Sequence, residues 1–246
     1  MPPRRCIMVE WLNMSNNNTR LYVIGDIHGR SDLLDRLIAT IDREAKDLGA
    51  DCLTVTLGDY IDRGADSRGV LDRLSRNPFP GNYVALKGNH EALLETFLGD
   101  PAVGAHWYRL GGLETLRSFG VRTEAFFGSR SFKKVRDQMR TALSIEHTQF
   151  LASLKTSITF GRYFMCHAGV RPGIPLESQN EDDLLWIRDE FLGSELDFGK
   201  IVVHGHTPTQ EPEVLPNRIN IDTCAFASGR LTCVVLEGGR HRFITA

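Results

Sequence analysis

Residues 53–64 have the sequence LTVTLGDYIDRG, in which an apolar, β-branched run ends in a turn that combines glycines with charged side chains. The run Leu53–Leu57 is typical of a buried strand. The glycines at 58 and 64 let the backbone turn sharply and leave room for a ligand. The same arrangement occurs in LYVIGDIHG at 21–29 and in YVALKGNHE at 83–91. The chain therefore contains three predicted strands that each end in a polar turn.

Helical spacing of apolar residues follows each of these strands. Ser31 is a candidate N-cap for a helix whose apolar face consists of Leu33, Leu34, Leu37, Ile38 and Ile41. Further helices are predicted around 70–74 and 90–98. The order βαβαβα favours a parallel or mixed sheet with helices packed on its faces. Ligands of such sheets bind beyond the carboxyl ends of the strands, so the three polar turns are expected to meet in one crevice.

The remainder of the chain divides into a tail, further strands and an insertion. Residues 1–20 lack a clear period and are expected to form a flexible N-terminal tail. Residues 21–246 are then one domain, since a chain of this length can bury most of its apolar surface in a single α/β core. Within it, 99–154 is mainly polar and helical and is expected to form a cap-like insertion. A second, more antiparallel sheet is predicted from the apolar runs Tyr163–Cys166, Ile201–Val203, Ile219–Ile221 and Leu231–Leu236.

The composition points to no macromolecular partner. The 29 basic residues nearly balance the 31 acidic ones, so no overall field attracts nucleic acid or an anionic membrane. No segment approaches the ~20 apolar residues of a membrane span, and the apolar stretch after Arg5 is too short for a signal peptide. The five cysteines lack CxxC or zinc-ribbon spacing and are expected to be reduced. We expect a cytoplasmic protein with neither a nucleic-acid nor a membrane partner.

Two histidine motifs follow later apolar runs in the same manner, with His167 in CHAG and with His204 and His206 in HGHTP. Carboxylate, imidazole and amide oxygen ligands suit manganese, iron, zinc or magnesium, whereas copper(I) or an iron–sulfur cluster requires thiolates. A carboxylate shared by two cations offsets their repulsion, and Asp59 is the candidate for this bridge. Each motif alone could be an ordinary turn or helix cap. Their joint occurrence favours a metal site, because clustered Asp and His side chains need a ligand to offset burial and repulsion.

Five ordered motifs give the sequence a family resemblance: GDIHG at 25–29, GDYIDRG at 58–64, GNHE at 88–91, HAG at 167–169 and HGHTP at 204–208. Together they resemble the phosphoprotein phosphatase family, in particular bacterial serine/threonine protein phosphatases, within the calcineurin-like metallophosphoesterases. The resemblance extends from about Leu21 to Leu236. Pro208 stands where broader relatives carry another histidine, which the narrower family also lacks. The implied fold is α/β, a four-layer α/β/β/α sandwich of two mixed sheets.

The resemblance also implies ligands for two divalent cations, which we expect to be manganese, with iron, zinc and magnesium as alternatives. The implied ligands are Asp26, His28 and the bridging Asp59 for the first cation, and Asn89, His167 and His206 with Asp59 for the second. His204 is expected to pack beside the site or to orient a neighbouring ligand. Asp222 follows a late strand and could reach the site, but only its position connects it to the centre.

Catalytic roles follow from the same resemblance. It implies direct hydrolysis, in which a hydroxide held between the cations attacks phosphorus and no phosphoenzyme forms. His90 would protonate the departing oxygen, with Asp62 holding its other ring nitrogen. Arg63 would bind two phosphoryl oxygens, and Arg188 in the stretch LWIRD resembles a second phosphate-binding arginine of bacterial members. Lys87 stands where some relatives have arginine and is left out of the catalytic set, because lysine lacks the bidentate geometry.

The expected reaction is hydrolysis of phosphate monoesters, with phosphoserine and phosphothreonine in proteins or peptides as the leading substrates. A symmetrical diadenosine tetraphosphate hydrolase is the alternative, because such enzymes share the motifs. The insertion 99–154 is then expected to decide what enters the cleft. A non-catalytic scaffold of the same fold is a third hypothesis. The intact set of metal and acid residues argues against it, since a scaffold has no chemical need for them.

Overall fold

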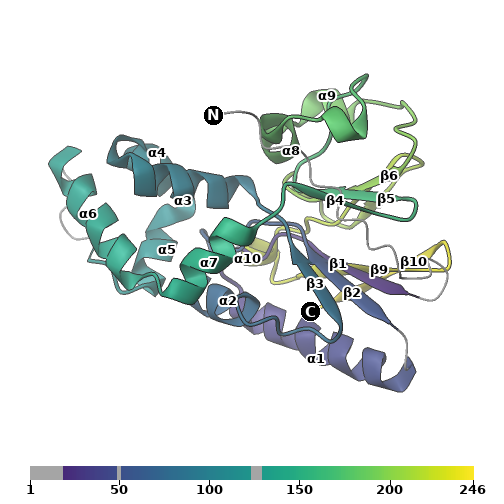
Figure 1. Cartoon of the computed structure of the whole chain (residues 1–246), viewed down its shortest axis with the longest axis horizontal. Coiled ribbons are helices and arrows are strands. Elements are labelled where there is room, and N and C mark those ends of the chain that lie inside the picture. The colour runs from purple at the N-terminus through teal and green to yellow at the C-terminus, as the bar shows by residue number, and fades with distance from the viewer. Residues whose placement is uncertain (1–18, 49–50, 123–128) are drawn as a thin grey trace.

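The computed structural model describes residues 19–48, 51–122 and 129–246, so the expected tail lies outside the described residues except for Thr19 and Arg20. Within these ranges the strands form two mixed five-stranded sheets (Figure 1). The first has the order β10-β9-β1-β2-β3 and comprises β1 (Arg20–Ile24), β2 (Cys52–Thr56), β3 (Asn82–Ala85), β9 (Thr232–Glu237) and β10 (Arg240–Thr245). The second has the order β4-β5-β6-β8-β7 and comprises β4 (Ser157–Phe160), β5 (Tyr163–Cys166), β6 (Ile201–His204), β7 (Glu213–Val214) and β8 (Arg218–Asn220).

Helices cover the outer faces of both sheets, and this confirms the predicted four-layer α/β/β/α arrangement. The first sheet packs against α1 (Ser31–Leu48) and α2 (Ser67–Leu74), and the second against α8 (Glu181–Trp186) and α9 (Asp189–Leu192). The other helical elements are α3 (Asn89–Gly99), η1 (Pro101–Val103), α4 (Gly104–Trp107), η2 (Tyr108–Gly112), α5 (Leu113–Ser118), α6 (Ser129–Ala142), α7 (Ile145–Ser153), η3 (Leu176–Ser178) and α10 (Ala225–Ser228).

The side chains of each central strand alternate between two apolar cores. In β1, Tyr22 and Ile24 point to the core beneath the helices, whereas Leu21 and Val23 point to the core between the two sheets. All four side chains are at most 1% exposed. A strand buried on both faces is continuously apolar instead of alternating. This explains why the runs before the polar turns could be recognised as strands from sequence.

Two details of the predicted second sheet are wrong. The run that becomes β9 pairs antiparallel with β1 and therefore belongs to the first sheet. The second sheet is also no more antiparallel than the first, because β5, β6 and β8 are mutually parallel and only its outer strands β4 and β7 run antiparallel. An apolar run buried on both faces carries no mark of which neighbour it will pair with. The prediction that Ser31 is the N-cap of its helix is also wrong. Ser31 is the first residue of α1, and its hydroxyl donates to the Asp66 carboxylate at 2.5 Å.

The segment 99–154 is largely helical in its described part, as predicted. Its helices, η1 to α7, lie together at one end of the sheets, on the left of Figure 1. The aromatic residues at 126 and 127 lie outside the described residues. No helix within the described ranges is long and apolar enough to span a membrane.

Candidate metal centre

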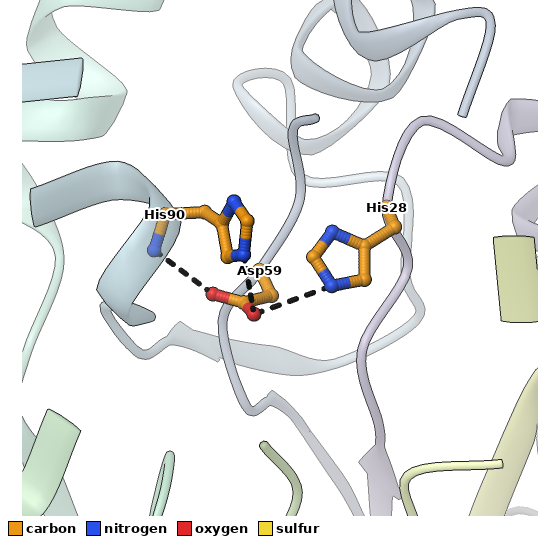
Figure 2. Close-up of side chains that lie close together, drawn as sticks. All are labelled: His28, Asp59 and His90. Atoms are coloured by element: carbon orange, nitrogen blue, oxygen red, sulfur yellow. Dashed lines mark hydrogen bonds and ion pairs between the residues drawn. The ribbon is translucent and has the colours of Figure 1, made fainter. Parts of the chain in front are cut away.

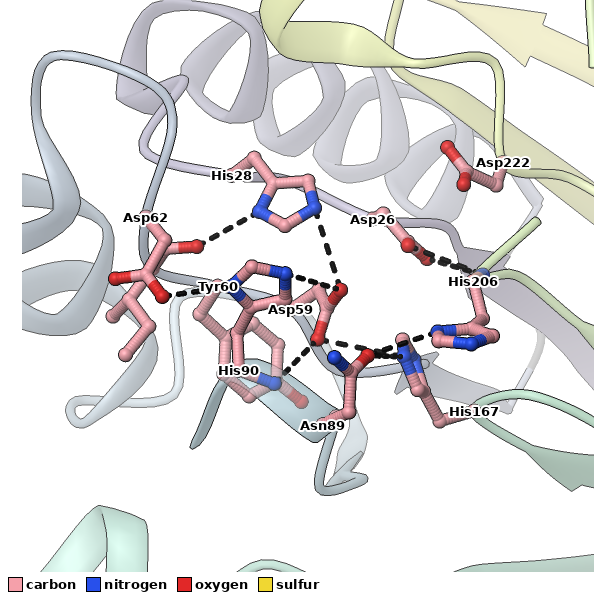
Figure 3. A network of polar contacts seen from close by, with 12 residues as sticks. Asp26, His28, Asp59, Tyr60, Asp62, Asn89, His90, His167, His206 and Asp222 are labelled. Atoms are coloured by element: carbon pink, nitrogen blue, oxygen red, sulfur yellow. Dashed lines mark hydrogen bonds and ion pairs between the residues drawn. The ribbon is translucent and has the colours of Figure 1, made fainter. Parts of the chain in front are cut away.

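The polar turns meet because the strands that carry them are parallel. Strands β1, β2 and β3 are parallel neighbours in the first sheet, and β5 and β6 are parallel neighbours in the second, so each group ends at one edge of its sheet. Backbone hydrogen bonds then join the turns. The N–H of His28 donates to the carbonyl of Asp59 at 2.8 Å, and the N–H of Gly205 donates to the carbonyl of His167 at 2.8 Å. The six predicted ligands and the pair His90 and Asp62 thus gather in one place (Figure 3).

The backbone at the site is conformationally unusual. Of the seven non-glycine residues with positive φ in the described ranges, five are predicted site residues: His28, Asp59, Asp62, Arg63 and His206. Left-handed backbone is unfavourable for residues with a Cβ, and such positions concentrate at functional sites. The surrounding hydrogen bonds therefore hold these side chains in directions that a relaxed turn would not give them.

His28 presents one ring nitrogen to Asp59 in the form that a metal requires. Its Nδ1 lies 2.8 Å from the carbonyl oxygen of Ile61, so this nitrogen carries the proton and donates it. The buried Nε2 then has a lone pair, lies 3.3 Å from Asp59 Oδ2 and has no hydrogen-bond partner (Figure 2). A buried lone pair that faces a carboxylate is repelled by it unless a cation lies between them.

A second group of lone pairs surrounds Asn89. The Oδ1 atom of Asn89 is 2.9 Å from both His167 Nε2 and His206 Nδ1. The Nδ1 of His167 donates to the carbonyl of Leu57 at 3.0 Å, which leaves its Nε2 without a proton. Two acceptors, His167 Nε2 and Asn89 Oδ1, therefore face each other. These residues fit a bound cation, because a cation between these two atoms would satisfy both.

Both histidines of this group are neutral, which is the form that binds metals. Burial lowers the pKa of His167. Burial also lowers the pKa of His206, to about 2. The Nε2 atom of His206 is buried and has no hydrogen-bond partner. Each ring thus has one unprotonated nitrogen available as a ligand across the neutral pH range.

Asp59 lies between the two groups and is common to both. Its Oδ2 is the atom near His28, and its Oδ1 lies 3.4 Å from His167 Nε2. The ligand atoms of two sets lie within 4.8 Å of one another, namely those of His28, Asp59 and His90 and those of Asp59, His167 and His206. Although burial raises the pKa of Asp59, this pKa lies well below its usual range, and the nearby His90 ring, whose own pKa is raised, contributes to the lowering. The carboxylate is therefore ionised and shared, which is the arrangement predicted for a bridge.

Asp26 is close to the centre but is not a member of either set. Its Oδ2 accepts the backbone N–H of His206 at 3.1 Å (Figure 3). Burial raises the pKa of Asp26 well above its usual value, and the carboxylates of Asp222 and Asp59 add to this effect. Three acidic side chains thus crowd one buried region. Bound cations would relieve the repulsion that these carboxylates exert on one another.

His90 is bonded to Asp62 as predicted. Its Nδ1 lies 2.7 Å from Asp62 Oδ2, and its Nε2 lies 3.8 Å from Asp59 Oδ2. Burial alone would lower the pKa of His90, but the carboxylates of Asp59 and Asp62 raise it above its ordinary value. The ring can therefore hold a proton on Nε2 while Asp62 accepts the proton on Nδ1.

The two predicted arginines contact different parts of the cluster. The guanidinium of Arg63 lies over the ring of Phe226, 5.1 Å from its centroid, and the same ring packs edge-on against His28 at 5.5 Å. Arg188 is exposed, and its Nη2 donates to the carbonyl of His206 at 3.3 Å. Phe226 was not found from sequence, because only the fold brings α10, the helix after β8, to the turn after β2.

Three residues that the sequence left open or excluded are now placed. Lys87 forms ion pairs with Glu95 and Glu181, at 2.9 and 3.2 Å, which agrees with its exclusion from the catalytic set. His204 packs edge-on against a phenylalanine of α9 at 4.9 Å and belongs to neither ligand set. Asp222 lies beside Asp26 (Figure 3) and accepts the backbone N–H of residue 224 at 2.9 Å.

Glu91 ties two of the polar turns together, and sequence reasoning missed this role. Its Oε2 accepts the N–H groups of Asp59 and Gly88 at 2.8 and 2.9 Å, and its Oε1 accepts those of Tyr60 and Ile61 at 2.8 and 3.3 Å. Burial and the Asp59 carboxylate raise the pKa of Glu91 to about 7. The only signal in the sequence is its place in the first turn of a helix, where a glutamate often caps the chain.

Replacing Glu91 with Gln tests this role. We expect Glu91→Gln to lower the free energy of unfolding by about 2 to 4 kcal/mol, because in either orientation the Gln amide turns its NH₂ toward two buried N–H groups. Urea unfolding of the metal-free protein measures the loss. The matched control is Glu95→Gln on the same helix, which should cost less than about 1 kcal/mol because this residue is mostly exposed. Equal losses in the two variants would contradict the assignment.

Comparison with known proteins agrees with the site. Residues 19–233 match the family described as calcineurin-like phosphoesterase. The chain is 27% identical to serine/threonine-protein phosphatase 2 of Salmonella typhimurium, over 91% of this chain and 98% of that protein. It is 25% identical to an asymmetrical bis(5′-nucleosyl)-tetraphosphatase of Anoxybacillus flavithermus, over 72% of this chain and 73% of that protein. A solved structure provisionally named a diadenosine tetraphosphatase has a TM-score of 0.62 at 22% identity and covers 94% of this chain and 98% of its own.

The family match covers most of the chain and contains every polar turn of the centre. It confirms the resemblance that the five motifs gave, and the solved structure supports the fold. The chain therefore belongs to the calcineurin-like phosphoesterase family and is a phosphoric ester hydrolase.

Proposed function

We propose that the six predicted ligands hold two divalent cations and that the chain uses them to hydrolyse phosphate monoesters. The observation that carries this proposal is the Asp59 carboxylate, whose two oxygens face His28 on one side and His167 on the other. Bound cations would polarise phosphoryl oxygens and make water more acidic. Oxygen and imidazole ligands suit manganese, which we propose as the native metal, and they also suit iron, zinc and magnesium.

The other side chains around the centre have separate roles in the proposed reaction. His90 donates its Nε2 proton to the departing oxygen, while Asp62 accepts from Nδ1 and keeps the ring in place. Arg63, which lies over Phe226, and Arg188, which contacts the His206 carbonyl, bind phosphoryl oxygens and orient the ester. The guanidinium of Arg63 is held by Phe226, so it loses little conformational freedom when a phosphate binds.

Phosphoserine and phosphothreonine in proteins or peptides are the substrates we propose first. The similarity to a serine/threonine-protein phosphatase over nearly the whole of both chains supports this choice. A dinucleotide polyphosphate is the second candidate, and the relative named a tetraphosphatase supports it. One structural feature favours the second candidate: Trp186 is 41% exposed and its ring lies 6.3 Å from that of His206, where a nucleobase could stack on it.

Initial rates on two substrates separate these candidates. With manganese present, we expect a phosphothreonine peptide to be hydrolysed faster than diadenosine tetraphosphate. If the dinucleotide is also a substrate, Trp186→Ala should raise its KM by about fivefold or more and leave the KM of the peptide unchanged, because only the dinucleotide offers a base for stacking. Ile145→Ala is the control, since this side chain is also exposed but lies on α7.

Each of the other outcomes has a definite meaning. Strong turnover of the dinucleotide alone would overturn the proposed substrate class and leave the hydrolytic centre in place. A folded protein that binds no metal and turns over neither substrate would favour a scaffold. Elemental analysis after incubation with manganese distinguishes this case from a metal-loaded enzyme whose natural substrate is a third compound.

A further inference from the structure

Asp62 is held by side chains of the helical insertion as well as by His90. The Asp62 side chain is wholly buried. Its Oδ2 accepts the indole N–H of Trp107 at 2.8 Å as well as the His90 ring at 2.7 Å. Its Oδ1 accepts the hydroxyl of Thr115 at 2.6 Å. Both oxygens of the carboxylate are thus bonded to the segment that the sequence suggested was only a cap.

The backbone at Asp62 is held from the same side. Its N–H lies 2.8 Å from the hydroxyl oxygen of Thr115 and 3.0 Å from that of Ser67. The next N–H, of Arg63, donates to the carbonyl of Gly111 at 3.1 Å. Because Thr115 uses its proton for the carboxylate, Ser67 must donate to Thr115 across their 2.9 Å contact. These contacts keep Asp62 at a φ of 72°, in the left-handed region.

Packing fixes the position of Trp107 itself. The Trp107 ring is 1% exposed and stacks at 4.9 Å on Phe97, which is on α3, the helix that carries His90. A Cβ at Gly112 would lie 2.5 Å from the indole, and a Cβ at Gly111 would lie 2.7 Å from the Arg63 nitrogen. Gly112 therefore leaves room for the indole, and Gly111 allows the insertion to approach the turn after β2 closely.

We propose that Trp107 and Thr115 are positioning residues for protonation of the leaving group. They orient the Asp62 carboxylate, and Asp62 in turn fixes the direction in which Nε2 of His90 points. Without one of these donors, the carboxylate can rotate and His90 loses its alignment with the departing oxygen. The inference rests on the function proposed above and deepens it. Proton donation matters most for alkyl oxygens, the leaving groups of phosphoserine and phosphothreonine.

Thr115→Val and Trp107→Phe remove the two donors while keeping most of the packing. In the manganese-loaded enzyme we expect kcat for a phosphothreonine peptide to fall about tenfold or more, and kcat for 4-nitrophenyl phosphate to fall less than about threefold, with KM unchanged. Thr115→Ser restores the hydroxyl and should restore the ratio. Thr96→Val is the control, because this exposed hydroxyl bonds only to its own helix, at the carbonyl of residue 92.

A double-mutant cycle tests whether the two residues act through His90. In a His90→Asn background, Thr115→Val should cause little further loss on the peptide, because the donor that Asp62 orients is already missing. Equal losses on both substrates, or full additivity with His90→Asn, would overturn the positioning role. Melting temperature and metal content of each variant identify losses caused by unfolding or by failed metal loading.

A readout independent of turnover separates this inference from the proposed function. The proton on Nδ1 of His90 is expected to give a downfield NMR resonance that disappears in His90→Asn. It should shift in Thr115→Val and in Trp107→Phe but not in Thr96→Val. An unchanged resonance would overturn the positioning role whatever the activity. A shifted resonance in a protein that hydrolyses neither ester would sustain it and count against the proposed function alone.

Discussion

Asp59→Asn is expected to prevent the loading of both cations and to lower kcat/KM by more than about 100-fold on every ester. The substitution keeps the shape of the side chain but removes its charge and one of the two acceptor oxygens. Those oxygens are the atoms that face His28 and His167. Elemental analysis after incubation with manganese measures the metal content of the variant, and calorimetric titration measures the affinity.

A surface aspartate provides the control for this experiment. Asp35→Asn removes a carboxylate that pairs with Arg73 on the outside of the molecule, and it should leave metal content and turnover unchanged. If Asp59→Asn still bound two manganese ions per chain, Asp59 would not be the bridge. Loss of only one ion would assign the carboxylate to a single cation.

His90→Asn is expected to lower kcat for alkyl phosphates by roughly 10²- to 10⁴-fold and to have a much smaller effect on aryl phosphates. An asparagine amide can still bond to Asp62 but cannot act as an acid. Aryl leaving groups need little protonation, so the loss should depend on the pKa of the leaving alcohol. Rates on a series of esters with graded leaving groups measure this dependence.

His147→Asn is the matched control, because this buried histidine pairs with Asp72 at 2.7 Å and lies outside the metal-ligand sets. It should change the melting temperature without changing the ratio of alkyl to aryl turnover. Equal losses of His90→Asn on both kinds of ester would remove His90 from the acid role. The residue would then have to act through its ring, whose Nε2 lies 3.8 Å from Asp59 Oδ2.

The parts of the fold that were predictable are those in which local sequence determines the outcome. The strands β2 and β5 lie within one residue of their predicted bounds, because each is a short apolar run beside a glycine or polar turn. Strand β10 was missed, since its charged and largely exposed residues resemble a loop. The sheet to which β9 belongs could not be predicted, because strand pairing depends on contacts between distant segments.

The candidate site likewise contains residues that local sequence indicates and residues that only the fold brings together. Residues such as His90 and Asp62 stand in short motifs whose residue types suggest their chemistry. Thr115 and Trp107 support the same carboxylate from 53 and 45 positions away, and nothing in their own neighbourhood indicates this. The sequence can therefore suggest the reacting groups and the Asp62 partner of His90, whereas the residues that hold Asp62 appear only when the chain is folded.

The left-handed residues of the centre constrain how this protein could be made more heat-resistant. Each of them costs about 1 kcal/mol or more, and replacement by glycine would relieve that cost. At His28, Asp59 or His206 the same change would delete a proposed ligand. Selection for thermal stability alone would therefore favour a protein that is more stable but has lost its activity. Stabilising substitutions should therefore be sought in the apolar cores and the outer helices, and these turns should be left unchanged.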